Sequence, residues 1–319
     1  MDMRDAPSTY PVPTKPRQLQ DSQELLKVVQ KQSLASLKSL FGVSDSIARL
    51  NHNRYTNFDA LAEKHAMLAF DGPAYKGLGA PEFTEADISF AQDHLRILCG
   101  LYGVLRPLDA VRPYRLEMSN KLANPRGKDL YTFWGDSITE SLNQDLNEAV
   151  ATKETQKEMF VVNCASQEYF KAVNVEKLAG TIYHMMFPGP SVYAKQARGT
   201  MCRFIIKNRV TSPEQLKGFT GTDGEYKFNV SHSTETAFVF VRGVSVKTPK
   251  AAVTTPKAAV TTPKVSVGTP KVSVGTSKAA KKPTPAANKP AKEAPKAEQK
   301  EPPSNENARE ARASKRARK

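Results

Sequence analysis

Apolar residues recur at helical spacing in the first half of the chain. In residues 21–33, DSQELLKVVQKQS, two leucines and two valines fall on one face, which predicts an amphipathic helix. In residues 84–98, TEADISFAQDHLRIL, Thr84 and Asp87 resemble a capping box with a shortened acid. Apolar residues then continue at helical spacing as far as Leu98, so a second helix is expected there.

Three short apolar runs in the second half predict buried strands. They cover residues 158–164, 180–187 and 236–243. After the second run, Ser191 is expected to cap a helix over residues 192–210. Helices and strands alternate without a regular strand–helix–strand rhythm, so the pattern predicts an α+β or irregular α/β domain.

The chain changes character after Gly243. Seven-residue units follow one another, TPKAAVT twice and TPKVSVG twice, before a degraded copy. A proline in each full unit breaks the helical hydrogen-bond ladder, which excludes a coiled coil. Few large apolar residues and no aromatic residues remain to build a core. We expect residues 1–242 to form one domain and residues 243–319 to be a disordered Lys/Pro/Ala-rich basic tail.

Most of the net positive charge lies in this tail. Of the formal net charge of +15, +13 lies in residues 243–319 and +2 in residues 1–242. A basic surface on the domain must therefore come from the clustering of charges, because the domain carries little excess charge.

The three cysteines, Cys99, Cys164 and Cys202, lie far apart in the sequence. Their number is odd and their neighbours are apolar or small, so we expect buried thiols in a reducing compartment. No apolar run approaches the ~20 residues that span a bilayer, and the first residues lack the apolar region of a signal peptide. The sequence predicts a cytosolic protein without a membrane partner, or a nuclear one in a eukaryote because of the basic tail.

Residues 37–51, LKSLFGVSDSIARLN, resemble a helix-hairpin-helix motif. Gly42 would allow a tight turn, and the next helix would direct its unpaired amide groups toward a DNA phosphate. Ser44 stands where the motif has its second glycine, but serine can cap the following helix, so the turn can be kept. Asp45, at the start of that helix, carries a negative charge that opposes binding of an anion. The alternative is an ordinary corner between two helices.

A second basic candidate lies in the middle of the chain. Residues 98–118 contain two Arg-Pro pairs that exclude a helix, with glycines that let the chain turn. Residues 124–136, NPRGKDLYTFWGD, add a basic loop before an expected helix, with Tyr131 and Trp134 nearby for stacking on bases. Alternatively, Trp134 belongs to the core and the charges are only solvated.

A third candidate site supports the alternative hypothesis that the protein is an enzyme. The run NCASQEYFKAV places small polar residues after an expected strand, where active sites are common, with Ser166 or Cys164 as the nucleophile. Lys195 and Arg198 share one face of the helix that follows. His184 is the nearest candidate base, although a buried structural histidine fits its apolar surroundings better. No histidine shows metal-ligand spacing, and no phosphate-binding glycine loop is present.

Taken together, five long blocks resemble the YaaA peroxide-stress family. They are residues 66–78, 90–118, 124–139, 163–173 and 193–219. The resemblance implies one compact α+β domain with an unusual mixed-sheet fold, a helix-hairpin-helix element and a positively charged cleft. It also implies binding to double-stranded or irregular DNA, protection against hydrogen peroxide, and no established catalytic activity, cofactor or metal.

The residues expected to contact DNA follow from the motif and from the resemblance. They are Gly42, Val43, Ser44, Arg49, Arg112, Arg115, Arg126, Lys128, Lys171, Lys195, Arg198 and Arg203. The alternative function is an enzyme acting on a nucleotide or nucleic acid through residues 163–171 and 193–203. A scaffold that only its tail attaches to chromatin is the third hypothesis.

The chain departs from the family pattern in two places. Family members usually open with an additional strand that ends in Ser-Pro-Ala-Lys-Thr, so we expect that the N-terminal strand is missing here, most simply through the choice of start codon. Gln167 stands where an acidic residue or Asn is frequent, which weakens a catalytic role for that loop. The Thr-Pro-Lys repeats resemble linker-histone tails, and their Thr-Pro pairs predict phosphorylation by a proline-directed kinase.

Overall fold

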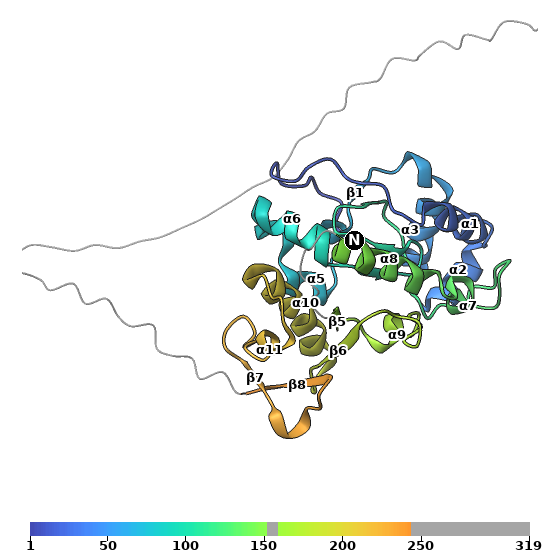
Figure 1. The fold of residues 1–319 in the computed structure, drawn as a ribbon. Coiled ribbons are helices and arrows are strands. Elements are labelled where there is room, and N and C mark those ends of the chain that lie inside the picture. Colours follow the sequence, from blue (N-terminus) through green and yellow to red (C-terminus); the bar gives the residue numbers. More distant parts are fainter. Residues whose placement is uncertain (152–158, 244–319) are drawn as a thin grey trace, which may run out of the picture. The chain divides into compact units, whose positions relative to one another are not determined.

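The computed structural model describes residues 1–151 and 159–243, which belong to one compact unit (Figure 1). The predicted tail lies outside the described residues. The longer helices are α1 (Leu19–Gln30), α2 (Leu34–Phe41), α3 (Asp45–Thr56), α6 (Glu85–His94), α8 (Ser137–Ala151) and α10 (Ser191–Asn208). The shorter helices are α4 (Ala66–Ala69), α5 (Pro73–Leu78), α7 (Leu130–Trp134), α9 (Gln167–Phe170) and α11 (Pro213–Leu216), with single 3-10 turns at Phe58–Ala60, Ala80–Glu82 and Val230–His232.

Within residues 1–151 and 159–243, the strands form three separate sheets. Two are antiparallel pairs: β1 (Lys64–His65) with β4 (Ala110–Val111), and β2 (Ile97–Cys99) with β3 (Gly103–Leu105). The third sheet has the order β5-β6-β8-β7, with β5 (Phe160–Asn163), β6 (Thr181–Met186), β8 (Ala237–Arg242) and β7 (Tyr226–Phe228). Its first three strands are parallel and β7 is antiparallel, so the sheet is mixed. The chain is therefore an α+β protein, as the sequence predicted.

The apolar side chains of the described part of the chain form two clusters. The larger one contains the buried faces of α1, α2 and α3 together with the β2–β3 pair and α7, and Trp134 is almost fully buried in it. The smaller one packs Met201 of α10 against Phe219 and the sheet residue Phe240, whose rings meet edge to face at 5.4 Å. Helix α10 contributes to both clusters, because Ile206 belongs to the larger one.

The helical predictions were largely confirmed, with two corrections at helix ends. The capping box of Thr84 and Asp87 is present at the start of α6. The helix ends at His94, however, because Leu95 is extended. The Arg96 guanidinium caps this end by donating to Gln92 O at 3.0 Å and to Leu95 O at 2.7 Å. Leu98, expected on this helix, lies in β2.

The second correction concerns Ser191. We expected it to cap the following helix, but Pro190 is the extended residue before α10 and Ser191 is already helical. A proline fixes φ near the value that precedes a helix, so the chain enters α10 without a side-chain cap. The predicted strands β5, β6 and β8 are present within the expected ranges.

Helix α10 crosses α5 at very short range (Figure 1). A Cβ atom on Gly199 would lie 1.6 Å from the Ala74 carbonyl oxygen and 2.8 Å from the Leu78 amide nitrogen. On the facing helix, a Cβ atom on Gly77 would lie 2.2 Å from the Gln196 carbonyl oxygen. Backbone thus meets backbone on both sides, and any side chain at either position would separate the two helices.

We expect Gly199→Ala to lower the free energy of unfolding by about 2–3 kcal/mol, because the obstructing atoms belong to the backbone and cannot rotate away. Chemical denaturation measures this difference. Gly243→Ala is the control, since a Cβ atom there meets nothing within 4 Å; its effect should stay within about 0.5 kcal/mol. Equal effects of the two substitutions would show that α5 and α10 do not depend on this contact.

Candidate functional site

Helices α2 and α3 pack on each other and are joined by residues 42–44 only. Gly42 ends α2 in the left-handed conformation, with φ of 59°, which glycine adopts without strain. The amides of Gly42 and Val43 donate to the carbonyl oxygens of Ser39 and Lys38, both at 3.3 Å. These two amides therefore complete the end of α2, and they do not point an unpaired N–H toward a ligand.

The beginning of α3 is different. Its first intrahelical bond runs from the Ala48 amide to Ser44 O at 2.9 Å. Among the described residues, the preceding amides of Asp45, Ser46 and Ile47 have no acceptor, and the Ser44 hydroxyl bonds to the Ser46 hydroxyl instead of capping the helix. The corner thus offers the first-turn amides of α3 to solvent.

Charges around this corner also favour an anion. Asp45, which opposes an anion, forms an ion pair with Lys38 at 2.9 Å, and the hydrogen bond from that lysine lowers the pKa of the Asp45 carboxyl. Arg49 lies exposed one turn further along α3. Val43 is half-buried and packs against the larger apolar cluster, which fixes the corner on the body of the domain.

Four arginines expected to contact DNA are held by carboxylates of the same chain. The ion pairs are Arg112–Glu63 at 3.0 Å, Arg115–Glu117 at 2.8 Å, Arg126–Asp21 at 2.6 Å and Arg203–Glu82 at 2.7 Å. Arg126 also pairs with Glu24 and lies 4.2 Å from the Phe133 ring centre, and Arg203 donates to the Gly79 carbonyl oxygen at 2.9 Å. These partners neutralise the arginines and fix their orientation.

The aromatic residues of the basic loop have separate roles. Trp134 is 1% exposed, and its indole N–H donates to Gly100 O at 3.0 Å. It is therefore a core residue, as the alternative interpretation of the sequence held, and it cannot stack on a base. Tyr131 is half-buried, donates to Glu168 O at 2.9 Å and carries the Lys171 ammonium 4.9 Å above its ring centre. Lys128 and Lys195 are exposed on the surface.

The loop after β5 does not assemble a nucleophile with a base. The Asn163 amide nitrogen lies 3.0 Å from Nδ1 of His184, and Asn163 Oδ1 accepts from the Ala165 amide at 2.9 Å. His184 is thus held by an amide. Cys164 lies beside Cys202 of α10, and a hydrogen bond with that residue, together with burial, raises the pKa of the Cys164 thiol.

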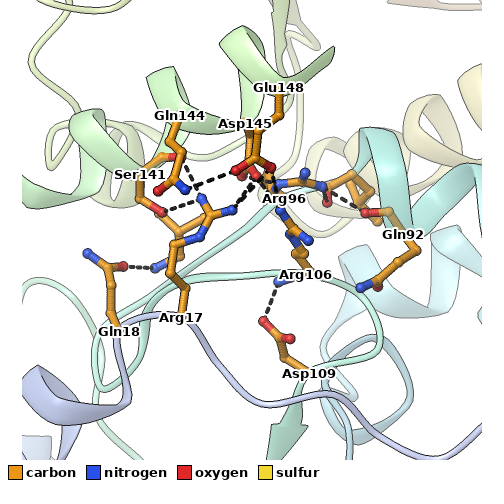
Figure 2. A network of polar contacts seen from close by, with 12 residues as sticks. Arg17, Gln18, Gln92, Arg96, Arg106, Asp109, Ser141, Gln144, Asp145 and Glu148 are labelled. Atoms are coloured by element: carbon orange, nitrogen blue, oxygen red, sulfur yellow. Dashed lines mark hydrogen bonds and ion pairs between the residues drawn. The ribbon is translucent and has the colours of Figure 1, made fainter. Parts of the chain in front are cut away.

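The sequence did not predict the network of polar contacts around Asp145 (Figure 2). Asp145, on α8, accepts from Arg17 at 2.8 Å, from Arg96 at 2.5 Å and from Arg106 at 2.7 Å (Figure 2). Glu148, one turn later, lies 3.2 Å from Arg106 and 3.6 Å from Arg17. The three arginines come from the extended N-terminal segment, the end of α6 and the chain after β3.

A cavity of about 150 Å³ adjoins this cluster. It is lined by Thr14, Lys15, Arg17, Gln92, Val104, Arg106, Asp109, Ser141 and Asp145. At the cavity wall, the Asp109 carboxylate accepts hydrogen bonds from the Thr14 hydroxyl at 2.7 Å and from the Arg106 amide at 2.8 Å. The residues LRPLD of the second candidate therefore bind the N-terminal segment to the domain. Of the preceding glycines, Gly100 lies in the turn between β2 and β3, and Gly103 begins β3 with a φ of 71°.

The fold and these contacts can be set beside known proteins. A family model described as peroxide stress protein YaaA matches residues 1–232. The chain belongs to the YaaA family of peroxide stress proteins. The match covers the α2–α3 corner and the Asp145 cluster, and it stops before the basic repeats.

Two features are absent from the described residues. No helix among them is long and apolar enough to cross a bilayer. Across residues 1–151 and 159–243, no group of three or more His, Cys, Asp or Glu side chains is placed to hold a metal ion.

We expect Asp145→Asn to lower the free energy of unfolding at pH 7 by about 2 kcal/mol. Burial acts to raise the pKa of Asp145, but hydrogen bonds from Arg96 and Arg106 outweigh it and hold the pKa at about 2, against an ordinary 3.8. A lowered folded-state pKa stabilises the protein above pH 3.8, and this contribution is lost as the pH falls toward 2.

The wild-type chain and the variant should therefore differ most at pH 7 and converge near pH 2–3 in denaturant titrations. Glu214→Gln is the matched control, since Glu214 forms an exposed ion pair with Lys217 at 2.7 Å; it should cost less than about 1 kcal/mol. A difference between Asp145→Asn and wild type that stays constant with pH would contradict the assignment.

Proposed function

We propose that this protein serves the peroxide stress response by binding DNA through the phosphate backbone, at the corner between α2 and α3. The observation that carries the proposal is the open first turn of α3. Three amides that find no acceptor among the described residues, at the positive end of the helix dipole and beside exposed Arg49, favour a phosphate oxygen. Such contacts bind the backbone and do not select a base sequence.

Apart from Arg198, which is half-buried, the remaining charged residues predicted to contact DNA divide into two groups. Lys128, Lys171 and Lys195 are exposed and can bind phosphate without breaking a carboxylate pair. Arg112, Arg115, Arg126 and Arg203 must exchange a carboxylate partner for a phosphate, so we propose only a minor role for them. Gly42 and Val43 act by shaping the corner, because their own amides are used within the chain.

The basic repeats add electrostatic affinity for DNA without a defined binding geometry. Residues 243–319 carry +13 of the net charge, and each phosphate that they neutralise steepens the salt dependence by about 0.9 in a log–log plot. We propose that phosphorylation of the Thr-Pro pairs by a proline-directed kinase weakens this contribution.

An enzyme acting on a nucleotide or nucleic acid is the second hypothesis. It needs a base beside Ser166 or Cys164, whereas the Nδ1 atom of His184 faces the Asn163 amide. The raised pKa of Cys164 also keeps that thiol protonated, which disfavours it as a nucleophile. The geometry therefore favours the binding function.

We expect Ser46→Glu to weaken binding of random duplex by residues 1–242 about tenfold at low ionic strength, because a carboxylate would stand where a phosphate is proposed. The same change should leave stability unchanged or slightly raised, since an acid in the first turn favours the helix. Fluorescence anisotropy and thermal melts measure the two effects. Arg49→Ala should reduce the slope of log affinity against log salt by about 1.

Ala35→Glu is the matched control for Ser46→Glu. It adds the same charge at an exposed position in the first turn of the neighbouring helix α2. Affinity should then change little. Equal losses of DNA affinity in the two variants would show that only the added charge matters, and not its place at the start of α3. If folded residues 1–242 do not bind DNA at all, the proposal is refuted.

The tail has its own test in the full-length chain. Glutamate at Thr248, Thr255, Thr262 and Thr269 should weaken duplex binding several-fold near physiological salt, because four negative charges are added to the basic tail. Alanine at the same four positions is the control and should bind as the wild type does. Unchanged affinity of the glutamate variant would refute control by phosphorylation.

A further inference from the structure

A second cavity, of about 160 Å³, lies between α10 and the β7–β8 strand pair. It shares no lining residue with the cavity beside Asp145. The register of the two strands places Tyr226 opposite Arg242, and both side chains line the cavity. The Tyr226 hydroxyl donates to the Tyr193 carbonyl oxygen at 3.4 Å, so the sheet is tied to the first turn of α10 beside the cavity.

One face of α10 forms part of this cavity. Positions 193, 196, 197 and 200 line it, and their spacing places them on the same side of the helix. Tyr193 is 43% exposed, and Gln196 is exposed beside it. The Gln196 carbonyl oxygen accepts from the Thr200 hydroxyl at 3.2 Å, but its side-chain amide has no hydrogen-bond partner among the described residues. That amide is therefore available to a ligand in the cavity.

Arg242 differs from most arginines of the domain, because no carboxylate neutralises it. Its guanidinium carbon lies 3.9 Å from the centre of the Tyr193 ring. Within residues 1–151 and 159–243 it has neither an ion pair nor a hydrogen bond, and it is exposed. The two side chains therefore form a flat, positively charged surface. Guanidinium planes and exposed aromatic rings are the groups on which proteins stack nucleobases.

The loop before β7 adds hydrogen-bond acceptors to the cavity. The exposed Asp223 carboxylate has no partner among the described residues, and Glu225 uses its Oε2 atom to accept from the Asp223 amide at 2.8 Å. Carboxylate oxygens accept from the exocyclic amine of a base, and a glutamine amide pairs with N6 and N7 of adenine together. Uracil and thymine present a carbonyl oxygen in place of that amine, so these carboxylates would repel them.

We propose that this cavity binds an adenine base, either of a free nucleotide or of an unpaired position in a nucleic-acid strand. The base stacks against the Tyr193–Arg242 surface, and its amine donates to the carboxylates and to Gln196. The size is suitable, because an engineered cavity of about 150 Å³ holds one benzene molecule. A flat ring can therefore enter here, while the sugar and the phosphate stay outside.

This site is separate from the corner between α2 and α3. None of the residues that line the cavity belongs to those helices. Binding of a free nucleotide is consequently independent of the DNA binding proposed above, whereas binding of an unpaired base in DNA rests on that proposed function. A base contact would also add what phosphate contacts lack, which is a preference among nucleotides.

The test titrates the full-length protein with adenosine monophosphate (AMP) and, separately, with uridine monophosphate (UMP) in a calorimeter at constant ionic strength. Both nucleotides carry the same ribose and phosphate, so binding of their phosphates to the basic repeats cancels in the comparison. We expect AMP to bind about tenfold more tightly than UMP, because only its base offers the amine.

Four variants at exposed positions test the assignment. Tyr193→Ala should weaken AMP binding about tenfold through loss of stacking, and Tyr193→Phe should bind as the wild type does. Gln196→Ala should reduce the preference for AMP over UMP. Val192→Ala is the matched control, since Val192 is exposed in the same turn of α10 and does not line the cavity; it should change neither affinity.

The source of the base is tested with duplexes that contain one unpaired adenine or one unpaired thymine. Preference for the unpaired adenine without AMP binding assigns the site to a strand, and AMP binding without that preference assigns it to a free nucleotide. The proposal is overturned if neither preference is observed, or if Tyr193→Ala retains the preference. A protein that binds AMP but no duplex would refute the proposed DNA binding and support this site.

Discussion

The Asp145 carboxylate is the interaction on which the first half of the domain depends. One side chain on α8, 9% exposed, accepts hydrogen bonds from three arginines that belong to three separate parts of the chain. Removing a carboxylate of this kind leaves several positive charges close together and partly desolvated, which is more costly than the loss of one surface ion pair. The extended N-terminal segment also packs Met1, Met3 and Tyr10 against the larger apolar cluster, so this charge contact fixes only the end of the segment that leads into α1.

The same principle explains why a domain with many arginines has so few of them available for a ligand. Arg17, Arg96 and Arg106 surround Asp145, and most of the arginines expected at a DNA surface pair with other carboxylates of the chain. An arginine in a short ion pair holds two segments of the chain together in a fixed orientation. Backbone amides do not form such ion pairs. The first-turn amides of α3 are therefore better placed to donate hydrogen bonds to an anion than these arginine side chains are.

Local signals in the sequence predicted local structure well. The capping box of Thr84 and Asp87, the glycine that ends α2 and the β-branched and aromatic strands depend on residues close together in the chain, so spacing alone identifies them. Leu98 was misplaced because apolar spacing continues from α6 into β2, and spacing alone does not show that Leu95 is extended and ends the helix, where Arg96 caps it.

Contacts between distant residues could not be predicted in the same way. Arg17 and Asp145 are 128 positions apart, and an acid in a helix such as α8 has the sequence signature of a solvated surface residue. The meeting of Cys164 and Cys202 likewise depends on how α10 lies beside the loop after β5. Odd and scattered cysteines argue correctly against a disulfide framework, but they say nothing about whether two thiols come into contact.

Charge and geometry are separated along this chain. Residues 1–242 are nearly neutral and carry the defined corner at α3, whereas residues 243–319 carry almost all of the net charge. In the proposed DNA binding, counterion release would make the affinity contributed by the basic repeats fall steeply with salt, while the amides at the start of α3 would contribute a small and fixed number of directed hydrogen bonds. A protein built in this way can have its overall affinity changed by modifying the repeats without altering the contact made by the domain.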